Sequence, residues 1–268
     1  MLELMNISKS FKRGLLHSGH QTVLDNVSFS LERGRTLGIM GDSGSGKTTL
    51  ARIAVRTIDP DEGSVFLDDT DITSFSSNKM SMYRSQLQMI FQHPEGALNP
   101  ELKLDESLSE ALLKSGIPRS RLKDIKDDVC DEMNISPTLL NRYPMQVSGG
   151  EIQRVALARA MAFDPNYLFM DEPTSMLDVS IQAHILNFIS RRSRKNNMGI
   201  VFITHDLDIV RKMCDDILIL YHGNTIGLGA VEDILDSDSH EQIKNLVDFW
   251  DASKNIEEHL KETLEQDL

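Results

Sequence analysis

The stretch that decides the fold reads Gly41-Asp42-Ser43-Gly44-Ser45-Gly46-Lys47-Thr48. It fits the pattern G-x-x-x-x-G-K-[ST], in which glycines allow several backbone N–H groups to converge on one anion. A mostly apolar run at 35–40 precedes it and a helix-compatible segment follows at 47–56. The stretch therefore joins a strand to a helix N-terminus, where the helix dipole adds positive potential. The sequence predicts a phosphate-binding loop made of these residues and Thr49.

Two side chains of the loop and a second motif supply the chemistry of such a site. We expect Lys47 to reach the outer phosphates and the Thr48 hydroxyl to coordinate Mg²⁺. Farther along, Leu168-Phe169-Met170-Asp171-Glu172 is an apolar strand that ends in two acids. Asp171 is placed to hold Mg²⁺, directly or through water, and Glu172 to accept a proton from attacking water. Kinases, GTPases, helicases and transport ATPases all fit these two motifs.

The rest of the chain alternates strand and helix patterns, except in one helical stretch. The expected strands lie at 2–8, 22–31, 35–40, 64–68, 86–91, 167–171, 199–204, 216–221 and 225–229. From about 94 to 154 the pattern is helical, which indicates an inserted subdomain. Strand–helix alternation implies a mostly parallel, helix-covered sheet. The predicted fold class is α/β: a P-loop NTPase core with a mostly parallel sheet, an antiparallel β subdomain and an inserted helical subdomain.

Charge is concentrated at the end of the chain. The formal net charge is −13, and the segment 231–268 holds twelve acids against three lysines. Because nucleic-acid binding needs a basic footprint, we expect no nucleic-acid partner. Ile243, Leu246, Val247 and Trp250 recur at helical spacing within this segment. We therefore expect a nucleotide-binding domain at 1–236, followed by an acidic helical tail at 237–268.

Hydrophobic patterning gives no sign of a membrane segment. No stretch approaches the ~20 consecutive apolar residues that a spanning helix needs. The N-terminal residues also lack a basic region followed by an apolar core, so no secretory signal is expected. Membrane attachment would then come through another chain.

One motif separates the classes of nucleotide-binding protein: Val147-Ser148-Gly149-Gly150-Glu151-Ile152-Gln153-Arg154. Ser-Gly-Gly at the start of a helix offers exposed N–H groups, a hydroxyl and the helix dipole to an anion, and Ser148 also suits a helix N-cap. Here the chain resembles the ABC ATPase superfamily, whose signature is written LSGGQ. The resemblance implies that Ser148, Gly149 and Gly150 contact nucleotide.

The remaining elements of that superfamily follow in order. Gln92 ends the run MIFQ, where the family has its Q-loop glutamine, and it is expected to contact Mg²⁺ and the catalytic centre. Ser175-Met176-Leu177-Asp178 resembles the D-loop, which makes Asp178 a nucleotide-site residue. His205 follows the run VFIT, at the place of the family's catalytic switch histidine. Phe11 stands where an aromatic residue stacks on adenine.

The chain departs from the family pattern without losing a group that the chemistry needs. Glu151 replaces the signature glutamine and Val147 its leading leucine. Met176 replaces the D-loop alanine, and Phe11 the more usual tyrosine. The Ser-Gly-Gly core of the signature is kept, so we expect these changes to tune dimer affinity and rate.

Narrower similarities indicate a subfamily. The run DVSIQAHIL at 178–186 is similar to the DVSIQAxIL run of ATPases that serve dipeptide, oligopeptide and nickel importers. Gln92-His93-Pro94 with Ala97-Leu98-Asn99-Pro100 resembles their QDP…SLNP segment. Many relatives carry a cysteine cluster after the core, which this chain lacks. Its absence favours the shorter, nickel-type member.

The resemblance also implies partners and a mechanism. Two ATPase subunits, copies or paralogues, would face head to tail, so that each ATP lies between one phosphate loop and the other signature. Glu172 would activate water while Lys47 and His205 stabilise the transferred phosphoryl group, with Mg²⁺ present. Transmembrane permease subunits would be gripped through the helical insertion and Gln92. An extracytoplasmic solute-binding protein would act indirectly, and this chain would lie on the cytoplasmic face of the membrane.

Two rival interpretations remain. The first is a soluble ABC ATPase of DNA maintenance or translation. Such DNA-repair proteins usually insert a coiled coil or zinc module between loop and signature, and translation factors usually fuse two cassettes. The second is a P-loop kinase, which would have no use for Ser-Gly-Gly-Glu or a D-loop.

Overall fold

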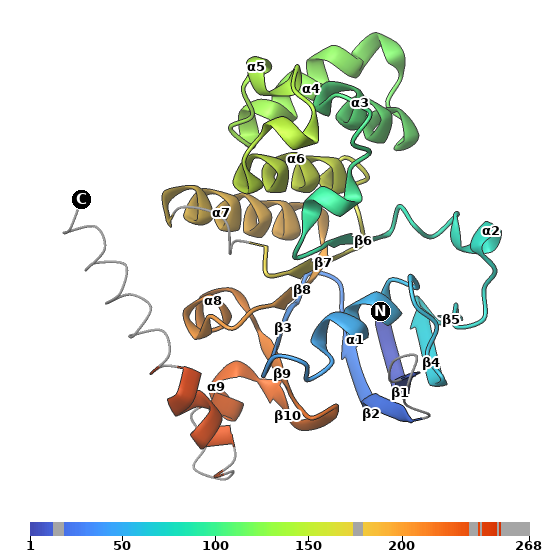
Figure 1. Cartoon of the computed structure of the whole chain (residues 1–268), viewed down its shortest axis with the longest axis vertical. Coiled ribbons are helices and arrows are strands. Elements are labelled where there is room, and N and C mark those ends of the chain that lie inside the picture. The colour runs from blue at the N-terminus through green and yellow to red at the C-terminus, as the bar shows by residue number, and fades with distance from the viewer. Residues whose placement is uncertain (13–18, 174–178, 236–240, 242, 251, 253–268) are drawn as a thin grey trace. The chain divides into compact units, whose positions relative to one another are not determined.

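Figure 1 shows a computed structural model of the chain, which describes all residues except 13–18, 174–178, 236–240, 242, 251 and 253–268. Two compact units can be distinguished by their internal contacts. The first, unit 1, comprises Met1–Leu31, Arg35–Thr73 and Phe202–Leu268. The second, unit 2, comprises Glu32–Gly34 and Ser74–Val201. Each is described by itself.

Unit 1 contains the antiparallel sheet that the sequence predicts. Its strand order is β2-β1-β4-β5. The strands are β1 (Leu2–Lys12), β2 (His20–Leu31), β4 (Glu62–Leu67) and β5 (Thr70–Asp71). In β1, Leu2 and Leu4 are buried, and a register shift before Ile7 turns Ile7 to the same face. β1 is longer than predicted, so Phe11 lies within a strand.

A second set of strands in unit 1 leads to the phosphate loop. The strand β3 (Thr36–Gly41) runs parallel to β9 (Asp216–Tyr221), and β9 pairs antiparallel with β10 (Asn224–Ala230). His222 and Gly223 join β9 to β10, both with positive φ, as a two-residue hairpin turn requires. The helices here are α1 (Lys47–Ala54), α8 (Leu207–Met213) and α9 (Val231–Leu235).

The described part of the acidic tail packs on the core of unit 1. Residues 243–250 are helical (Figure 1), and Ile243, Val247 and Trp250 are buried. They join one apolar cluster with Met40 of β3 and Ile217 of β9, against which Leu246 is also packed. The apolar stripe read from the sequence therefore covers the chain's own core, while Asp248 and Phe249 are exposed.

Unit 2 combines two parallel strands with most of the helices. The strands β6 (Leu87–Ile90) and β7 (Tyr167–Asp171) are paired, and β8 (Gly199–Ile203) begins in unit 2 and ends in unit 1. The helices are α2 (Ser77–Met80), α3 (Leu104–Lys114), α4 (Leu122–Glu132), α5 (Pro137–Leu140), α6 (Gly149–Met161) and α7 (Val179–Asn196), with short 3₁₀ turns η1 (Pro94–Ala97), η2 (Arg119–Arg121) and η3 (Pro144–Gln146).

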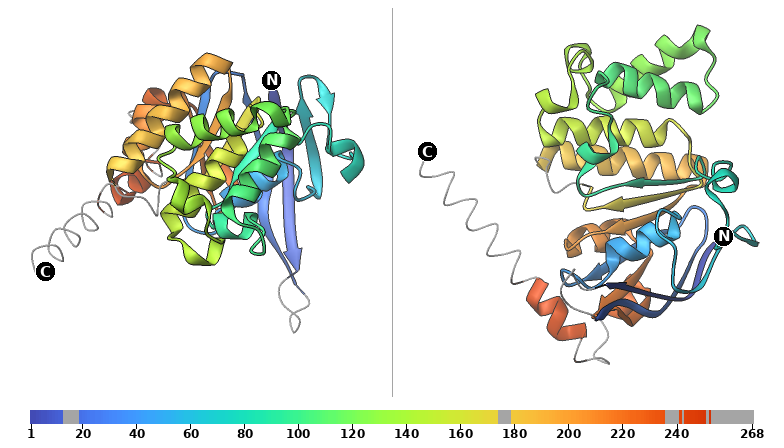
Figure 2. Two further views of the ribbon diagram at one scale, coloured as in Figure 1. Left: turned by 90° about the horizontal axis from the view of Figure 1, so that it is seen from above. Right: turned by 45° about the vertical axis from the view of Figure 1, so that its right-hand side comes forward.

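The helices at 94–154 gather beside α6, as Figures 1 and 2 show in green and yellow-green. Local chemistry sets their ends. Gly116, with φ +95, follows α3, and the hydroxyls of Ser136 and Ser148 cap α5 and α6. The α/β fold class, with parallel and antiparallel strands and this helical stretch, is confirmed. By contacts the stretch belongs to the same unit as β6 and β7, so its separate domain bounds stay a prediction.

No helix within the described ranges is both long enough and apolar enough to cross a membrane.

Candidate nucleotide-binding and catalytic site

The phosphate loop of unit 1 has a backbone that only glycine accommodates. Gly41 ends β3 with φ +147, and a Cβ there would lie 2.1 Å from the carbonyl oxygen of Leu220 in β9. Gly46 has φ +104, and its Cβ would lie 2.6 Å from the side chain of Leu24. Gly44, with φ +79, has open space around it. The glycine pattern of the sequence thus has a steric cause at both ends of the loop.

The interior of the loop is polar and fits phosphate oxygens. The Lys47 ammonium donates to the carbonyl oxygens of Gly41, at 2.6 Å, and Asp42, at 2.8 Å. Helix α1 starts at Lys47 without a side-chain cap, so its first N–H groups are not taken by an N-cap side chain. Ser45 is 1% exposed, and its hydroxyl has no hydrogen-bond partner among the described residues. This glycine cradle, with a lysine and an orphaned hydroxyl, suits the phosphates of ATP.

The other loop residues line the same turn and the start of α1. Ser43 is exposed, Asp42 is half-buried, and Thr48 and Thr49 are half-buried in the first turn of the helix. The Ser45 N–H donates to the Asp42 carbonyl at 3.1 Å, which closes the turn. The structure therefore brings together all the loop residues that the sequence predicts.

Phe11 and His205 also belong to unit 1. Phe11 is 40% exposed on β1, and the Lys9 ammonium lies 5.6 Å from its ring centroid. An exposed aromatic face suits stacking on a base. His205 is exposed and follows β8. The N–H of Thr204, the residue before it, donates to the carbonyl of Ile39 in β3 at 3.4 Å. His205 thus stands beside the strand that leads into the phosphate loop.

In unit 2 the two predicted acids lie at the end of β7. Asp171 is 2% exposed, the last residue of a strand that is buried throughout. In the parallel pair, Ile90 of β6 lies opposite Met170 of β7, so the residues that follow both strands emerge at one edge. There the Gln92 amide nitrogen donates to a carboxylate oxygen of Glu172 at 2.8 Å. The structure therefore brings the predicted Q-loop glutamine to the predicted base.

The backbone of Glu172 is held in an unusual conformation. Its φ is +49, in the left-handed region that residues other than glycine rarely adopt. Its carbonyl oxygen accepts a hydrogen bond of 3.4 Å from the amide nitrogen of Gln153, on α6. Sequence reasoning quoted Gln153 within the signature but assigned it no role, because nothing local in the sequence connects it to Glu172.

The signature segment forms the N-terminus of α6. Ser148 is the N-cap, and its N–H and its hydroxyl each lie 2.9 Å from a Glu151 carboxylate oxygen, to which both donate. These bonds hold the pKa of Glu151 below its usual range, the backbone N–H of Ser148 contributing most. Gly149 and Gly150 form the first turn. Glu151, a departure from the family pattern, thus completes a capping box. The predicted D-loop, with Asp178, lies outside the described residues.

A glycine-built phosphate loop, a buried strand that ends in two acids and a capped Ser-Gly-Gly helix together define a nucleotide-binding cassette. The family model described as ABC transporter matches residues 24–175. The chain belongs to the ABC transporter family, and it is an ATP-binding, ATP-hydrolysing enzyme.

Particular relatives are similar over most of the chain. The di/tripeptide transport ATP-binding protein DppF of Pseudomonas aeruginosa is 37% identical, over 88% of this chain and 73% of its own length. The oligopeptide transport ATP-binding protein OppF of Haemophilus influenzae is 35% identical, over 92% and 77%. A dimeric ATP-binding cassette solved in a post-hydrolysis state with ADP and Pi is 26% identical, with a TM-score of 0.77, over 86% of this chain and 99% of that one.

Proposed function

We propose that this chain is the ATP-hydrolysing subunit that powers an ABC importer of di- or oligopeptides or of nickel. The observation that carries the enzymatic part is the phosphate loop, where only glycine fits at Gly41 and Gly46 and Lys47 points back into the turn. The names of these relatives support peptide transport, and a relative from Brucella ovis, 34% identical, is named a putative peptide import ATP-binding protein. The run DVSIQAHIL at 178–186 resembles that of both peptide and nickel importers, so nickel is kept as the second candidate cargo. Cargo is selected by other chains.

We assign the chemistry to Glu172, Lys47 and His205. Glu172 is the general base, because its carboxylate follows the Mg²⁺ carboxylate of Asp171 and is oriented by Gln92. Lys47 and His205 stabilise charge on the transferred phosphoryl group. Phe11, residues 41–49 and Asp178 contact the nucleotide.

Magnesium is the cofactor that this set of residues fits. Thr48, Gln92 and Asp171 would hold it, and they offer a hydroxyl, an amide oxygen and a carboxylate, the oxygen ligands that Mg²⁺ prefers. Because the Gln92 amide nitrogen is used by Glu172, the amide oxygen is the atom left for a cation. When bound, Mg²⁺ neutralises charge on the phosphates.

We also propose that the chain acts as half of a head-to-tail dimer, with a copy or a paralogue. Ser148, Gly149 and Gly150 would then contact the nucleotide held by the other subunit, through the N–H groups at the start of α6. ATP closes such a dimer because it contacts both faces, and hydrolysis opens it. In this arrangement residues 1–236 bind and hydrolyse ATP, and we assign no catalytic group to the tail at 237–268.

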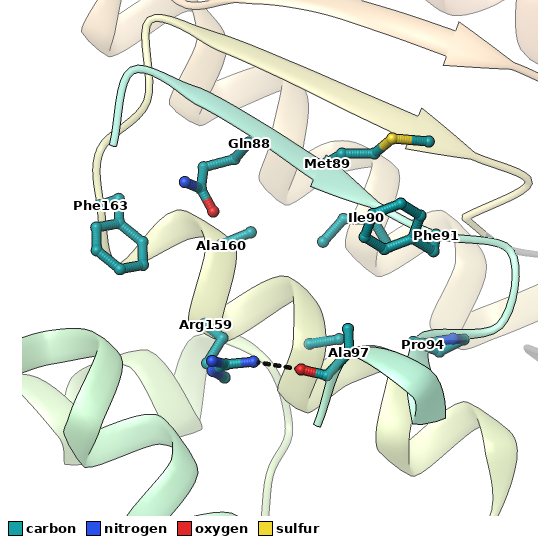
Figure 3. Close-up of a pocket in the computed structure, with 10 residues that line it drawn as sticks. Gln88, Met89, Ile90, Phe91, Pro94, Ala97, Arg159, Ala160 and Phe163 are labelled. Carbon is teal, nitrogen blue, oxygen red and sulfur yellow. Dashed lines mark hydrogen bonds between the residues drawn. The ribbon is translucent and has the colours of Figure 1, made fainter. Parts of the chain in front are cut away.

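A groove in unit 2 is the surface we assign to the permease (Figure 3). It lies where β6 and η1 face α6, and its walls include Ile90, Phe91 and Phe163. Arg159 donates to the carbonyl of Ala97 at 2.9 Å, while its Nε is buried without a hydrogen-bond partner among the described residues. Gln92 follows Phe91 of this wall in the chain, so a cytoplasmic permease segment seated in the groove would lie one residue away from the glutamine that contacts Glu172. The chain would thus sit peripherally on the cytoplasmic face of the membrane.

The test is to solubilise membranes in detergent, capture this chain and identify what co-purifies. We expect a permease pair and a second ATPase to co-purify. We also expect the captured complex to release phosphate from ATP without an acceptor substrate. Uptake of a labelled dipeptide and of labelled nickel by cells that lack the chain then decides the cargo. Recovery of the chain from the soluble fraction with DNA or ribosomes would instead support the alternative, a soluble ABC ATPase of DNA maintenance or translation.

A further inference from the structure

The turn that carries Glu172 is held from two sides by glutamine amides. The Gln92 amide nitrogen donates to the carboxylate, at 2.8 Å, and the Gln153 amide nitrogen donates to the main-chain carbonyl, at 3.4 Å. The first bond orients the side chain and the second orients the peptide. The two glutamines come from different parts of the chain, the turn that follows β6 and the second turn of α6.

Glu172 needs such support because its backbone is strained. A residue with a Cβ at φ +49 is disfavoured by about 1–3 kcal/mol, and it stays there only when its surroundings hold it. A hydrogen bond to the carbonyl of the strained residue restrains the rotation of its peptide directly. The 3.4 Å bond from Gln153 is therefore a contact that keeps the carboxylate of Glu172 aimed from the end of β7.

Stability alone does not account for an amide at position 153. Gln153 is 2% exposed, and its amide oxygen has no hydrogen-bond partner among the described residues. Burying an unpaired amide oxygen is unfavourable by about 1–3 kcal/mol, so an apolar side chain would suit this helix position better. Its neighbours Ile152 and Val155 are buried and apolar. The amide is retained at a stability cost, and the group that it touches is the backbone of the proposed base.

The position of Gln153 on α6 connects that base to the signature. Ser148 caps the helix, and Gln153 follows five residues later in the same helix. A helix is rigid over this distance, so a shift of its N-terminus moves the Gln153 amide as well. The helix end that would meet a second subunit's nucleotide thus also bears a donor to the chain's own Glu172.

We infer that Gln153 is a positioning residue: it holds the backbone of Glu172 in its catalytic conformation and ties that conformation to the signature helix α6. The inference rests on the proposed role of Glu172 as general base. It predicts that, when nucleotide contacts the signature of one subunit, the orientation of that subunit's own Glu172 changes. The two nucleotide sites of a dimer would be coupled through this amide.

The test replaces Gln153 by methionine, which keeps the length of the side chain and removes the donor. For the full-length Gln153→Met variant, kcat for ATP hydrolysis is expected to fall about 3- to 10-fold, the kinetic equivalent of one neutral hydrogen bond. The KM for ATP should stay within about 2-fold, because the phosphate loop is untouched. Gln153→Glu, which places an acceptor against the Glu172 carbonyl, is expected to lower kcat further.

The matched control is Gln86→Met. Gln86 lies in the same unit, and its amide oxygen accepts from the Asn166 amide at 2.9 Å, away from Glu172. This variant should lose a comparable hydrogen bond and keep wild-type kcat. Equal kcat values for the Gln153 and Gln86 variants, at matched melting temperatures, would overturn the inference.

A double-mutant cycle separates positioning from general damage. If Gln153 acts through Glu172, then Gln153→Met should not slow the residual hydrolysis of Glu172→Gln further, whereas a structural defect would add to it. Additive losses would therefore also overturn the inference. Normal turnover by Glu172→Gln alone would contradict the proposed function instead, so the two failures are distinguishable. Should Gln153→Met not fold, Gln153→Leu takes its place in both experiments.

Discussion

The phosphate loop of unit 1 and the Glu172 turn of unit 2 each keep a backbone with positive φ in place, but by different means. Both follow a buried strand, and both contain residues with positive φ. In the loop the residues are glycines, and the carbonyl of Leu220 leaves no room for a Cβ at Gly41. In the turn the residue is a glutamate, held by the amides of Gln92 and Gln153.

The difference shows which part of a catalytic site is encoded by residues that are adjacent in the sequence. A loop that wraps phosphate needs backbone N–H groups, so its geometry is encoded by adjacent glycines. A general base must keep a side chain, so glycine is excluded and distant residues have to hold the strained backbone. The loop should therefore be sensitive to changes in its own residues, and the turn also to changes elsewhere.

The largest effect is expected for Glu172→Gln. Removing a general base lowers the rate by about 10²- to 10⁴-fold, while the phosphate loop still binds ATP. An ATP-bound dimer should accumulate, which gel filtration with Mg-ATP would detect. Near-normal phosphate release by this variant would show that the turn does not carry the base.

Lys47→Ala should weaken ATP binding by about 100-fold, because it removes a charged donor to the outer phosphates. The two carbonyls that Lys47 contacts belong to the loop itself, so the fold should persist. Equilibrium titration with ATP, alongside circular dichroism, measures both quantities. Wild-type affinity in a folded variant would contradict the assignment of the loop.

Gly41→Ala tests whether the loop is encoded by sterics. It adds a Cβ that meets the Leu220 carbonyl, and destabilisation of more than about 2 kcal/mol is expected. Gly44→Ala is the matched control, because Gly44 also has positive φ but has open space around it. This variant should lower the free energy of unfolding by about 1 kcal/mol. Urea denaturation compares the two. Equal losses would mean that backbone conformation, rather than the close approach of β9, sets the requirement.

The smallest effect is expected for Glu151→Gln. The pKa of Glu151 is lowered by its bonds to Ser148, so its stabilisation is present above the ordinary pKa and is lost as pH falls through the lowered value. At pH 7 the variant should be less stable by at most about 1 kcal/mol. The difference in melting temperature should shrink as the pH falls below the ordinary pKa of a glutamate. A difference that grows on acidification would reverse the sign and refute the capping role.

Much of the fold was predictable because its signals are local. Strand 216–221 matches the structure, since an apolar run acts over a few positions. The apolar stripe of the tail was visible in the sequence, but the surface that it covers, the cluster with Met40, was not. A helical stripe shows that a surface must be covered and says nothing about which one.

By itself the sequence determined the phosphate loop, the acids at the end of a buried strand and the capped Ser-Gly-Gly helix. Each is a short run in which neighbouring residues create the chemistry. Only the tertiary structure decided that Gln92 meets Glu172 and that Gln153 holds its carbonyl. Those residues are 80 and 19 positions from Glu172, and chain folding rather than sequence spacing brings them within hydrogen-bonding distance.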